Sequence, residues 1–261
     1  PVKKKLETFR EKLLNESTVR QMTEDAYGNL WFGLQNGAVV KWDIKAANND
    51  IHKGYEVIKP KGLYYVQKLY SGKDGAIWVG CLNDGLYKYD ALTNKLLFHY
   101  TKHNADNKGL WSNSVNDVYA YNDSLLLIAD EALDILNIKT NNITHISTEN
   151  GLPSNTVLSI TSDNKGILWL GMANQLCRFN LTRKMFSTFN RRDGIGYDLF
   201  NVGGDYKMKD GRLVYLTDKN FIAFKPESVS ATAMPAKVVI THFTLGNTSL
   251  QVDSLYKFHT I

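Results

Sequence analysis

Short apolar runs separated by polar turns fill most of this chain. Runs such as Asn29–Gly33 and Ala76–Gly80 contain apolar, β-branched and aromatic residues, and each follows an Asp/Gly turn. The next run, for example Leu86–Asp90, alternates apolar and polar positions as a half-buried strand does. An apolar stripe with the 3.6-residue helical period is missing over any useful length, and the one helix-like stretch, Lys3–Asn15, also fits a strand. The pattern therefore predicts an all-β protein.

The same pattern returns about every 45 residues. The turn residue before each central strand stands at positions 28, 75, 124, 166 and 211, which gives steps of 47, 49, 42 and 45 residues. Three copies are clear, and their turns carry Asp25, Asp74 and Asp163. Two more copies, at 123–137 and 210–225, are degenerate. A regular period of this length indicates an array of one supersecondary unit.

Each repeat contains signals for four strands. The first three strands fall in five sets: 17–43, 63–90, 113–137, 155–180 and 200–225. A fourth strand is predicted at 97–100, 143–146 and 186–189, and a further one at about 6–10, before the first set. Four short strands in about 45 residues form one β-propeller blade. Five blades could close into a small ring or belong to a larger one, and a strand ahead of the first blade suits closure by strand exchange.

Composition adds little about function. Of 261 residues 43% are hydrophobic, which is enough for a packed core, and there is no apolar run of membrane-spanning length and no signal peptide. The net charge of +5 fits a solvated basic surface, or attraction of an acidic ligand, while the short basic runs do not predict nucleic-acid binding. Cys81 and Cys177 fall in different blades and are expected to be unpaired and buried.

Strong catalytic and metal signatures are missing from the sequence. The repeated tryptophans Trp31, Trp78 and Trp169 share one register, so we expect them to be core residues rather than sugar platforms. His99 and His103 have the spacing of helical metal ligands but lie on a strand and a loop. No metal site, cofactor or catalytic residue is therefore predicted.

The loops that lead into the first strand of each blade, called leader loops below, are the better candidates for ligand binding. In a propeller they open on one face, and several of their residues depart from the repeat consensus. Aromatic faces beside charged and amide groups suit carbohydrate recognition. The candidate ligand-binding residues are Tyr64, Tyr65, Trp111, Asn113, Arg191, Arg192, Tyr197 and Asp198. For Asn113, and for Asn155 in the same position, a turn-forming role is the alternative.

Two motifs carry a family resemblance. The D-x-x-G-x-L-W-x-G repeat with its G-L-P-S-N-x-V leader, closest over residues 151–171, resembles the regulator-propeller repeats of hybrid two-component sensors of gut Bacteroidetes. The segments Phe224–Glu227 and Ala236–Asn247 resemble the exit from the last blade into the immunoglobulin-like Y_Y_Y domain of those sensors. The resemblance spans about residues 15–260, with five repeats instead of seven and a sandwich that stops early.

The resemblance implies a role in periplasmic sensing. Residues 1–230 would be blades of a seven-bladed propeller, and residues 231–261 the truncated start of the immunoglobulin-like sandwich. The implied ligand is a glycan-derived oligosaccharide, acidic if the net charge is a guide, and the implied output is control of polysaccharide-utilisation genes. The full receptor would be a homodimeric histidine kinase whose catalytic domains are absent from this chain.

Two other function classes stay open. The repeat is also similar to that of streptogramin-lyase propellers, an enzyme class that needs a histidine base and carboxylates near one point; His103, in a loop, is the best-placed histidine. A protein-binding scaffold without a small ligand is the third reading, and it fits the third copy, where Asp130-Glu131 replaces the usual glycine hairpin.

Overall fold

The computed structural model describes residues 14, 17–48, 50, 52–59, 62–105, 108–196 and 199–229, with two short strands near the C-terminus. The chain divides into two compact units, residues 1–228 and 229–261. The described part of the second unit is one antiparallel hairpin of β20 (Phe243–Leu245) and β21 (Thr248–Leu250). The strand predicted near residues 6–10 and most of the predicted sandwich lie outside the described residues.

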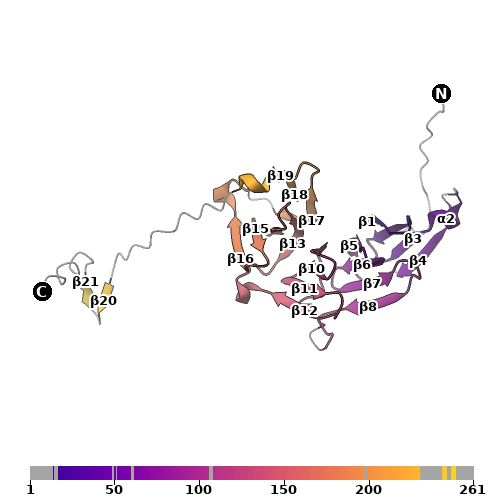
Figure 1. Ribbon diagram of the computed structural model, residues 1–261, viewed down its shortest axis with the longest axis horizontal. Helices are drawn as coiled ribbons and strands as arrows, with labels where there is room; N and C mark the ends of the chain where they lie inside the picture. The colour runs from indigo at the N-terminus through magenta and orange to yellow at the C-terminus, as the bar shows by residue number, and fades with distance from the viewer. Residues whose placement is uncertain are drawn as a thin grey trace, which may run out of the picture. The chain divides into compact units, whose positions relative to one another are not determined.

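The first unit is a series of five antiparallel sheets, each a propeller blade (Figure 1). In the order of the chain the strands of blades 1 and 2 are β1 (Val19–Glu24), β2 (Leu30–Leu34), β3 (Val39–Trp42) and β4 (Tyr55–Lys59), then β5 (Val66–Ser71), β6 (Ala76–Cys81), β7 (Leu86–Asp90) and β8 (Leu96–Tyr100). Those of blades 3 to 5 are β9 (Asp117–Ala120), β10 (Leu125–Ala129), β11 (Leu133–Asn137) and β12 (Ile143–Ile146), β13 (Val157–Ser162), β14 (Leu168–Met172), β15 (Gln175–Asn180) and β16 (Met185–Phe189), and β17 (Phe200–Lys207), β18 (Leu213–Thr217) and β19 (Phe221–Phe224).

Helical structure is confined to short connections. One α-helical turn, α2 (Ile44–Ala47), joins β3 to β4, and its N-cap Asp43 accepts a hydrogen bond from the Ala46 amide. Three 3₁₀ turns are η1 (Thr148–Asn150), η2 (Arg191–Asp193) and η3 (Pro226–Ser228). In the part of the chain that the structure describes, none of these elements has the length and apolarity that a membrane-spanning helix requires. The prediction of an all-β propeller with five repeats is confirmed.

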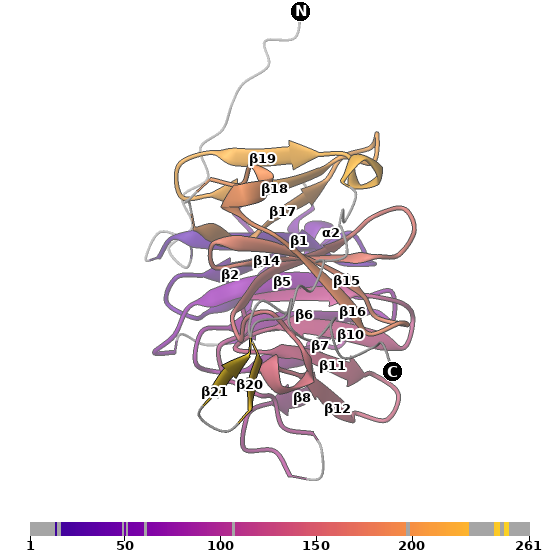
Figure 2. The ribbon, with the colours of Figure 1, turned by 90° about the vertical axis from the view of Figure 1, so that its left-hand side faces the viewer.

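The first strand of each blade is its innermost strand. The innermost strands β1, β5, β9, β13 and β17 contact one another in chain order, and the blades follow one another in an arc from indigo to orange in Figure 1. The sheets of successive blades stack face to face, as Figure 2 shows. Apolar side chains fill the space between successive sheets. Trp31 packs between blades 1 and 2, Trp78 between blades 2 and 3, and Leu127 between blades 3 and 4.

The three repeated tryptophans are buried, with Trp31, Trp78 and Trp169 at most 1% exposed. In blade 1 the turn before the central strand is held by Asp25, which accepts hydrogen bonds from the Asn29 amide and the Trp31 indole. Burial raises the pKa of Asp25, but the Trp31 and Asn29 hydrogen bonds outweigh this, so the pKa is lowered.

The backbone hydrogen bonds show which residues occupy equivalent positions in the turns of blades 1 and 2. The turn closes with a bond from the Asp25 amide to the Asn29 carbonyl in blade 1, and from the Gly72 amide to the Ala76 carbonyl in blade 2. Gly72, and not Asp74, therefore occupies the position of Asp25. Blade 2 thus lacks the carboxylate that accepts the indole hydrogen in blade 1.

Two further details complete the comparison with the predicted strands. The predicted fourth strands appear as β8, β12 and β16, whereas β4 was not predicted. Both cysteines are buried and free, with Cys81 on the second strand of blade 2 and Cys177 on the third strand of blade 4.

Candidate functional site

The leader loops of blades 2 and 3 each lie on the hairpin between the second and third strands of the preceding blade. The Gly62 amide donates to the Asn36 carbonyl, and the Gly85 amide donates to the Asn113 carbonyl. These bonds fix the leader loops at one end of the blades, because every innermost strand begins there. Loops held on a rigid scaffold are common places for binding residues.

The leader loop of blade 3 is held by two buried carboxylates. Asp130 accepts hydrogen bonds from the Ser112 amide at 2.9 Å and the Ala132 amide at 2.6 Å. Asp134 accepts one from the Trp111 amide at 2.8 Å. Both aspartates are fully buried. Buried carboxylates with complete hydrogen bonding impose a single loop conformation.

The second oxygen of Asp134 faces a histidine of the outer strand. His145 Nδ1 lies 2.7 Å from Asp134 Oδ1, and the two residues are direct partners in the β11–β12 register. The hydrogen bond to Asp134 raises the pKa of His145, although partial burial opposes this. Burial, together with the Asp134 charge, raises the pKa of Asp130 to about 9. Near neutral pH, Asp130 therefore carries a proton.

Trp111 stands over this network. Its backbone is held by Asp134, and its ring meets the edge of the His145 ring with centroids 5.6 Å apart. The side chain is 36% exposed, unlike the buried tryptophans of the repeat. An indole face at the surface with a fixed backbone can stack on a flat apolar face such as that of a sugar ring.

Asn113 and the equivalent Asn155 each fasten the start of a leader loop. Asn113 Oδ1 accepts a hydrogen bond from the Lys102 amide at 2.7 Å. Asn155 Oδ1 accepts the equivalent bond from the Thr148 amide at 2.8 Å. These bonds reach 11 and 7 residues back along the chain, so they close the leader loop instead of a local asparagine turn.

The remaining candidates are spread over two other leader loops. Tyr64 is exposed, and Tyr65 lies beneath the guanidinium of Arg20, whose Cζ is 4.4 Å from its ring centroid. Arg191 and Arg192 are exposed in η2, where Asn190 caps the turn. Tyr197 and Asp198, which follow them, lie outside the described residues. The leader-loop candidates thus occupy three loops, of blades 2, 3 and 5.

A second polar cluster lies on the propeller axis, and sequence reasoning missed it. Lys68 on β5 pairs with Asp117 on β9, whose other oxygen accepts a hydrogen bond from the Ile160 amide on β13. Burial, and then the nearby Asp117 charge, raises the pKa of Asp205 on β17 to about 8. Four innermost strands therefore meet around Asp117. The sequence did contain a signal for this cluster, because three of the predicted innermost strands each carry one of its charged residues, Lys68, Asp117 and Asp205.

Comparison with known proteins agrees with the repeat pattern. The two component regulator propeller family matches residues 13–36 and 151–174. These two segments contain the copies whose turn position holds an aspartate, Asp25 and Asp163. Histidine kinase P4 of Formosa agariphila is 26% identical over 103 residues, which are 40% of this chain and 8% of that relative.

Solved propellers share the fold. The extracellular domain of the putative hybrid two component system BT3049 from B. thetaiotaomicron has a TM-score of 0.60 and 18% identity over 84% of this chain and 29% of its own. The extracellular domain of the putative hybrid two component system BT4673 from the same organism has a TM-score of 0.63 and 14% identity, and the match covers 81% of this chain and 29% of that domain. The WD40 propeller of Doa1 has a TM-score of 0.55 and 9% identity, and the match covers 78% of this chain and 62% of that propeller.

The chain spans under a third of the length of the two B. thetaiotaomicron domains and under a tenth of the histidine kinase. The resemblance inferred from the repeat is confirmed. The chain carries two-component regulator propeller repeats, folded as blades like those in the extracellular domains of hybrid two-component systems.

Proposed function

We propose that this chain is part of the periplasmic sensor region of a hybrid two-component histidine kinase and that it binds glycan-derived oligosaccharides. The family match, the histidine kinase relative and the extracellular domains with the same fold support the sensor role. The chain would contribute blades to a seven-bladed propeller. Binding would lead to control of polysaccharide-utilisation genes.

The observation that carries the proposal is the setting of Trp111. The loop departs from the repeat consensus, exposes an indole face and is fixed from below by Asp130 and Asp134. A pre-organised aromatic platform binds with little loss of side-chain entropy. The apolar face of a pyranose ring would stack on Trp111, and its hydroxyl groups would reach polar groups of the neighbouring loops.

Signalling needs more than affinity. A ligand shifts a receptor only if it binds one conformation better than the other. We propose that the two conformations are two arrangements of the homodimer of the full receptor. They would differ in how the leader-loop face is placed against the rest of the sensor. Phosphoryl transfer would occur in kinase domains outside this chain, so the residues described here act in binding and transmission.

The net charge suggests a preference among glycans. A chain with a net charge of +5 attracts anions over a Debye length of about 8 Å at physiological salt. An acidic oligosaccharide would therefore bind more weakly as salt is raised. Equal affinity at low and high salt would rule out this preference and leave oligosaccharide binding itself untouched.

A thermal-shift screen with oligosaccharide fractions from pectin, xylan and mucin tests the proposal. We expect a stabilising fraction whose effect is lost in Trp111→Ala and largely kept in Trp111→Phe. Tyr206→Ala is the matched control, because Tyr206 is 64% exposed at the opposite end of an innermost strand. If no fraction stabilises this chain or a longer segment of the receptor that includes it, the proposal is wrong.

A further inference from the structure

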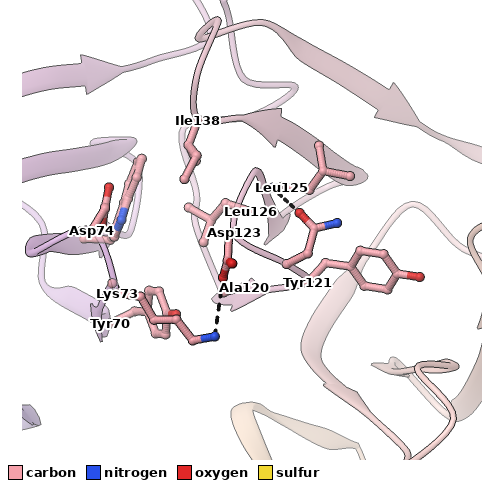
Figure 3. A pocket seen from close by; sticks show the side chains of 12 residues that line it. Tyr70, Lys73, Asp74, Ala120, Tyr121, Asp123, Leu125, Leu126 and Ile138 are labelled. Atoms are coloured by element: carbon pink, nitrogen blue, oxygen red, sulfur yellow. Dashed lines mark hydrogen bonds and ion pairs between the residues drawn. The ribbon is translucent and has the colours of Figure 1, made fainter.

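A cavity of about 470 Å³ opens between blades 2 and 3 (Figure 3). It lies beside the turns that follow β5 and β9, so it is at the end of the blades opposite the leader loops. Its volume falls within the range of small-molecule pockets, roughly 300–1,000 Å³. The residues that matter for its chemistry are Tyr70, Gly72, Asp74, Trp78, Tyr121 and Asp123.

The cavity exists because one lysine points differently in blade 2. In blade 1, Lys41 stands opposite Trp31 and crosses to the next blade, where Nζ donates to the Ala91 carbonyl at 2.7 Å. Lys88 stands opposite Trp78 in the same way, but its Nζ lies 3.0 Å from Asp74 Oδ2 of its own blade. The space that Lys41 fills between blades 1 and 2 is therefore open between blades 2 and 3.

The cavity wall contains a hydrogen-bond donor that has no acceptor in the described part of the protein. The Trp31 indole donates to Asp25 at 2.8 Å, and Gly72 occupies the position of Asp25 in blade 2. Trp78 is 1% exposed, and among the described residues no group accepts a hydrogen bond from its Nε1. A Cβ on Gly72 would lie 3.2 Å from that nitrogen and 2.4 Å from Asp74 Oδ1, so the Asp74 carboxylate and the indole nitrogen both border this position at the cavity. A ligand oxygen at the cavity can accept a hydrogen bond from the indole.

The other groups at the cavity suit an uncharged polyhydroxylated ring. The positive charges of Lys73 and Lys88 are balanced by Asp74 and Asp123. Lys73 Nζ and Asp123 Oδ1 form an exposed pair at 3.4 Å, drawn as a dashed line in Figure 3, and such pairs are weak enough to open for a ligand. Hydroxyl groups can accept from the indole and from Lys73 while they donate to the carboxylates.

We propose that this cavity binds one uncharged sugar ring, with the Trp78 indole donating to a ring or hydroxyl oxygen. The aromatic side chains of Tyr70 and Tyr121 supply apolar faces at the same cavity. This inference rests on the proposed function and adds a second place of contact, on the face opposite Trp111. The cavity selects only the ring that it holds, so the other rings of the oligosaccharide can be acidic.

Isothermal titration of this chain with D-galactose, D-glucose, D-xylose and L-arabinose tests the inference, with D-galacturonate as the charged probe. We expect millimolar binding of at least one neutral sugar. Gly72→Asn adds a side chain beside the Trp78 indole and pushes the Asp74 carboxylate from its place at the cavity, because a Cβ there would lie 2.4 Å from Asp74 Oδ1. It should weaken sugar binding by about tenfold or more.

Asp163→Asn is the matched control, because Asp163 has the same turn position in blade 4, and sugar binding should not change. Asp123→Ala, at an exposed position, should weaken binding about threefold even if Gly72→Asn fails to fold. Binding of D-galacturonate alone, no binding of any neutral sugar, or binding that neither cavity variant alters would each overturn the inference. If Trp111→Ala then still abolishes oligosaccharide binding, the proposed function survives and only the cavity assignment fails.

Discussion

Lys68 and Asp117 form an ion pair at the propeller axis, with Lys68 Nζ 2.6 Å from Asp117 Oδ1. The Asp117 side chain is 1% exposed and also accepts hydrogen bonds from the Val118 and Ile160 amides. Burial lowers the pKa of Lys68, but the charge and hydrogen bond of Asp117, together with the Asp205 charge, outweigh this, so the pKa is raised and the lysine stays charged. One carboxylate thus ties the innermost strands of blades 2, 3 and 4 together.

Removing that carboxylate should destabilise the propeller strongly. Asp117→Ala leaves Lys68 without its partner and two strand amides without an acceptor. Breaking a buried pair in this way costs about 3–5 kcal/mol of unfolding free energy. Urea denaturation followed by circular dichroism measures the loss. Lys53→Ala removes an exposed pair with Asp50 and should cost no more than about 1 kcal/mol, so similar losses in the two variants would contradict the assignment.

The free energy of unfolding should fall as the pH rises from neutral towards 9. The pKa of Asp130 is raised to about 9 and that of Asp205 to about 8, both chiefly by burial. An unfolded aspartate has a pKa of about 3.9, so above this value the unfolded chain loses protons that the folded chain keeps. Stability from these groups is complete below about pH 4 and declines until the folded pKa is passed. His145, whose pKa is also raised, contributes with the same sign above about pH 6.5.

Urea titrations at several pH values between 6 and 9 would test this pH dependence. Asp130→Asn is the informative variant, since it keeps one of the two oxygens that accept from the Ser112 and Ala132 amides and cannot ionise. Its stability should depend less on pH than that of the parent chain. A pH dependence that is identical in the two proteins would show that Asp130 does not titrate in this window.

The sequence predicted the blades well because their signals are local. A turn glycine such as Gly28 or Gly75 adopts a positive φ, and the apolar run after it packs between sheets whatever the rest of the chain does. Strand β4 was missed because α2 and its capping turn separate it from β3, which breaks the spacing of the repeat.

The polar networks could not be predicted in the same way. Asp134 meets His145 only through the register of β11 with β12, and Asp117 meets Lys68 only through the arrangement of three blades. Sequence reasoning singled out Trp111 because it departs from the consensus, but the carboxylates that hold it belong to a hairpin 18 or more positions away. Non-local contacts of this kind require the fold first.

The turn aspartates of blades 1 and 4 should differ in their contribution to stability. Asp25 accepts hydrogen bonds from backbone amides, from the Asn29 side-chain amide and from the Trp31 indole, whereas the bonds that Asp163 accepts come from the Lys165 and Ile167 amides. Asp25→Ala leaves a buried indole donor without a partner, which costs about 1–3 kcal/mol. Asp163→Ala should cost less by about 1–3 kcal/mol, close to the net worth of the two side-chain hydrogen bonds that Asp25 accepts in addition. Equal losses in urea titrations of the two variants would mean that the Asn29 and Trp31 side-chain bonds contribute nothing.

Two glycines with the same backbone angle should respond differently to an added methyl group. Gly85 and Gly166 have φ values of +75° and +73°, so alanine is strained at both by about 1–2 kcal/mol. At Gly166 an added Cβ meets nothing within 4 Å, while at Gly85 it would lie 2.1 Å from the Tyr100 carbonyl oxygen. The Gly85 hairpin also receives the leader loop through the Asn113 carbonyl, so moving it disturbs the next blade.

We therefore expect Gly166→Ala to cost only the strain of its backbone angle and Gly85→Ala to cost about 1–3 kcal/mol more, the usual range for overpacking. Denaturation midpoints in urea compare the two variants directly, because both add one methyl group to the same kind of turn residue. If Gly85→Ala is no less stable than Gly166→Ala, the hairpin can move away from β8. In that case the close contact between leader loop and hairpin does not fix the face that carries Trp111.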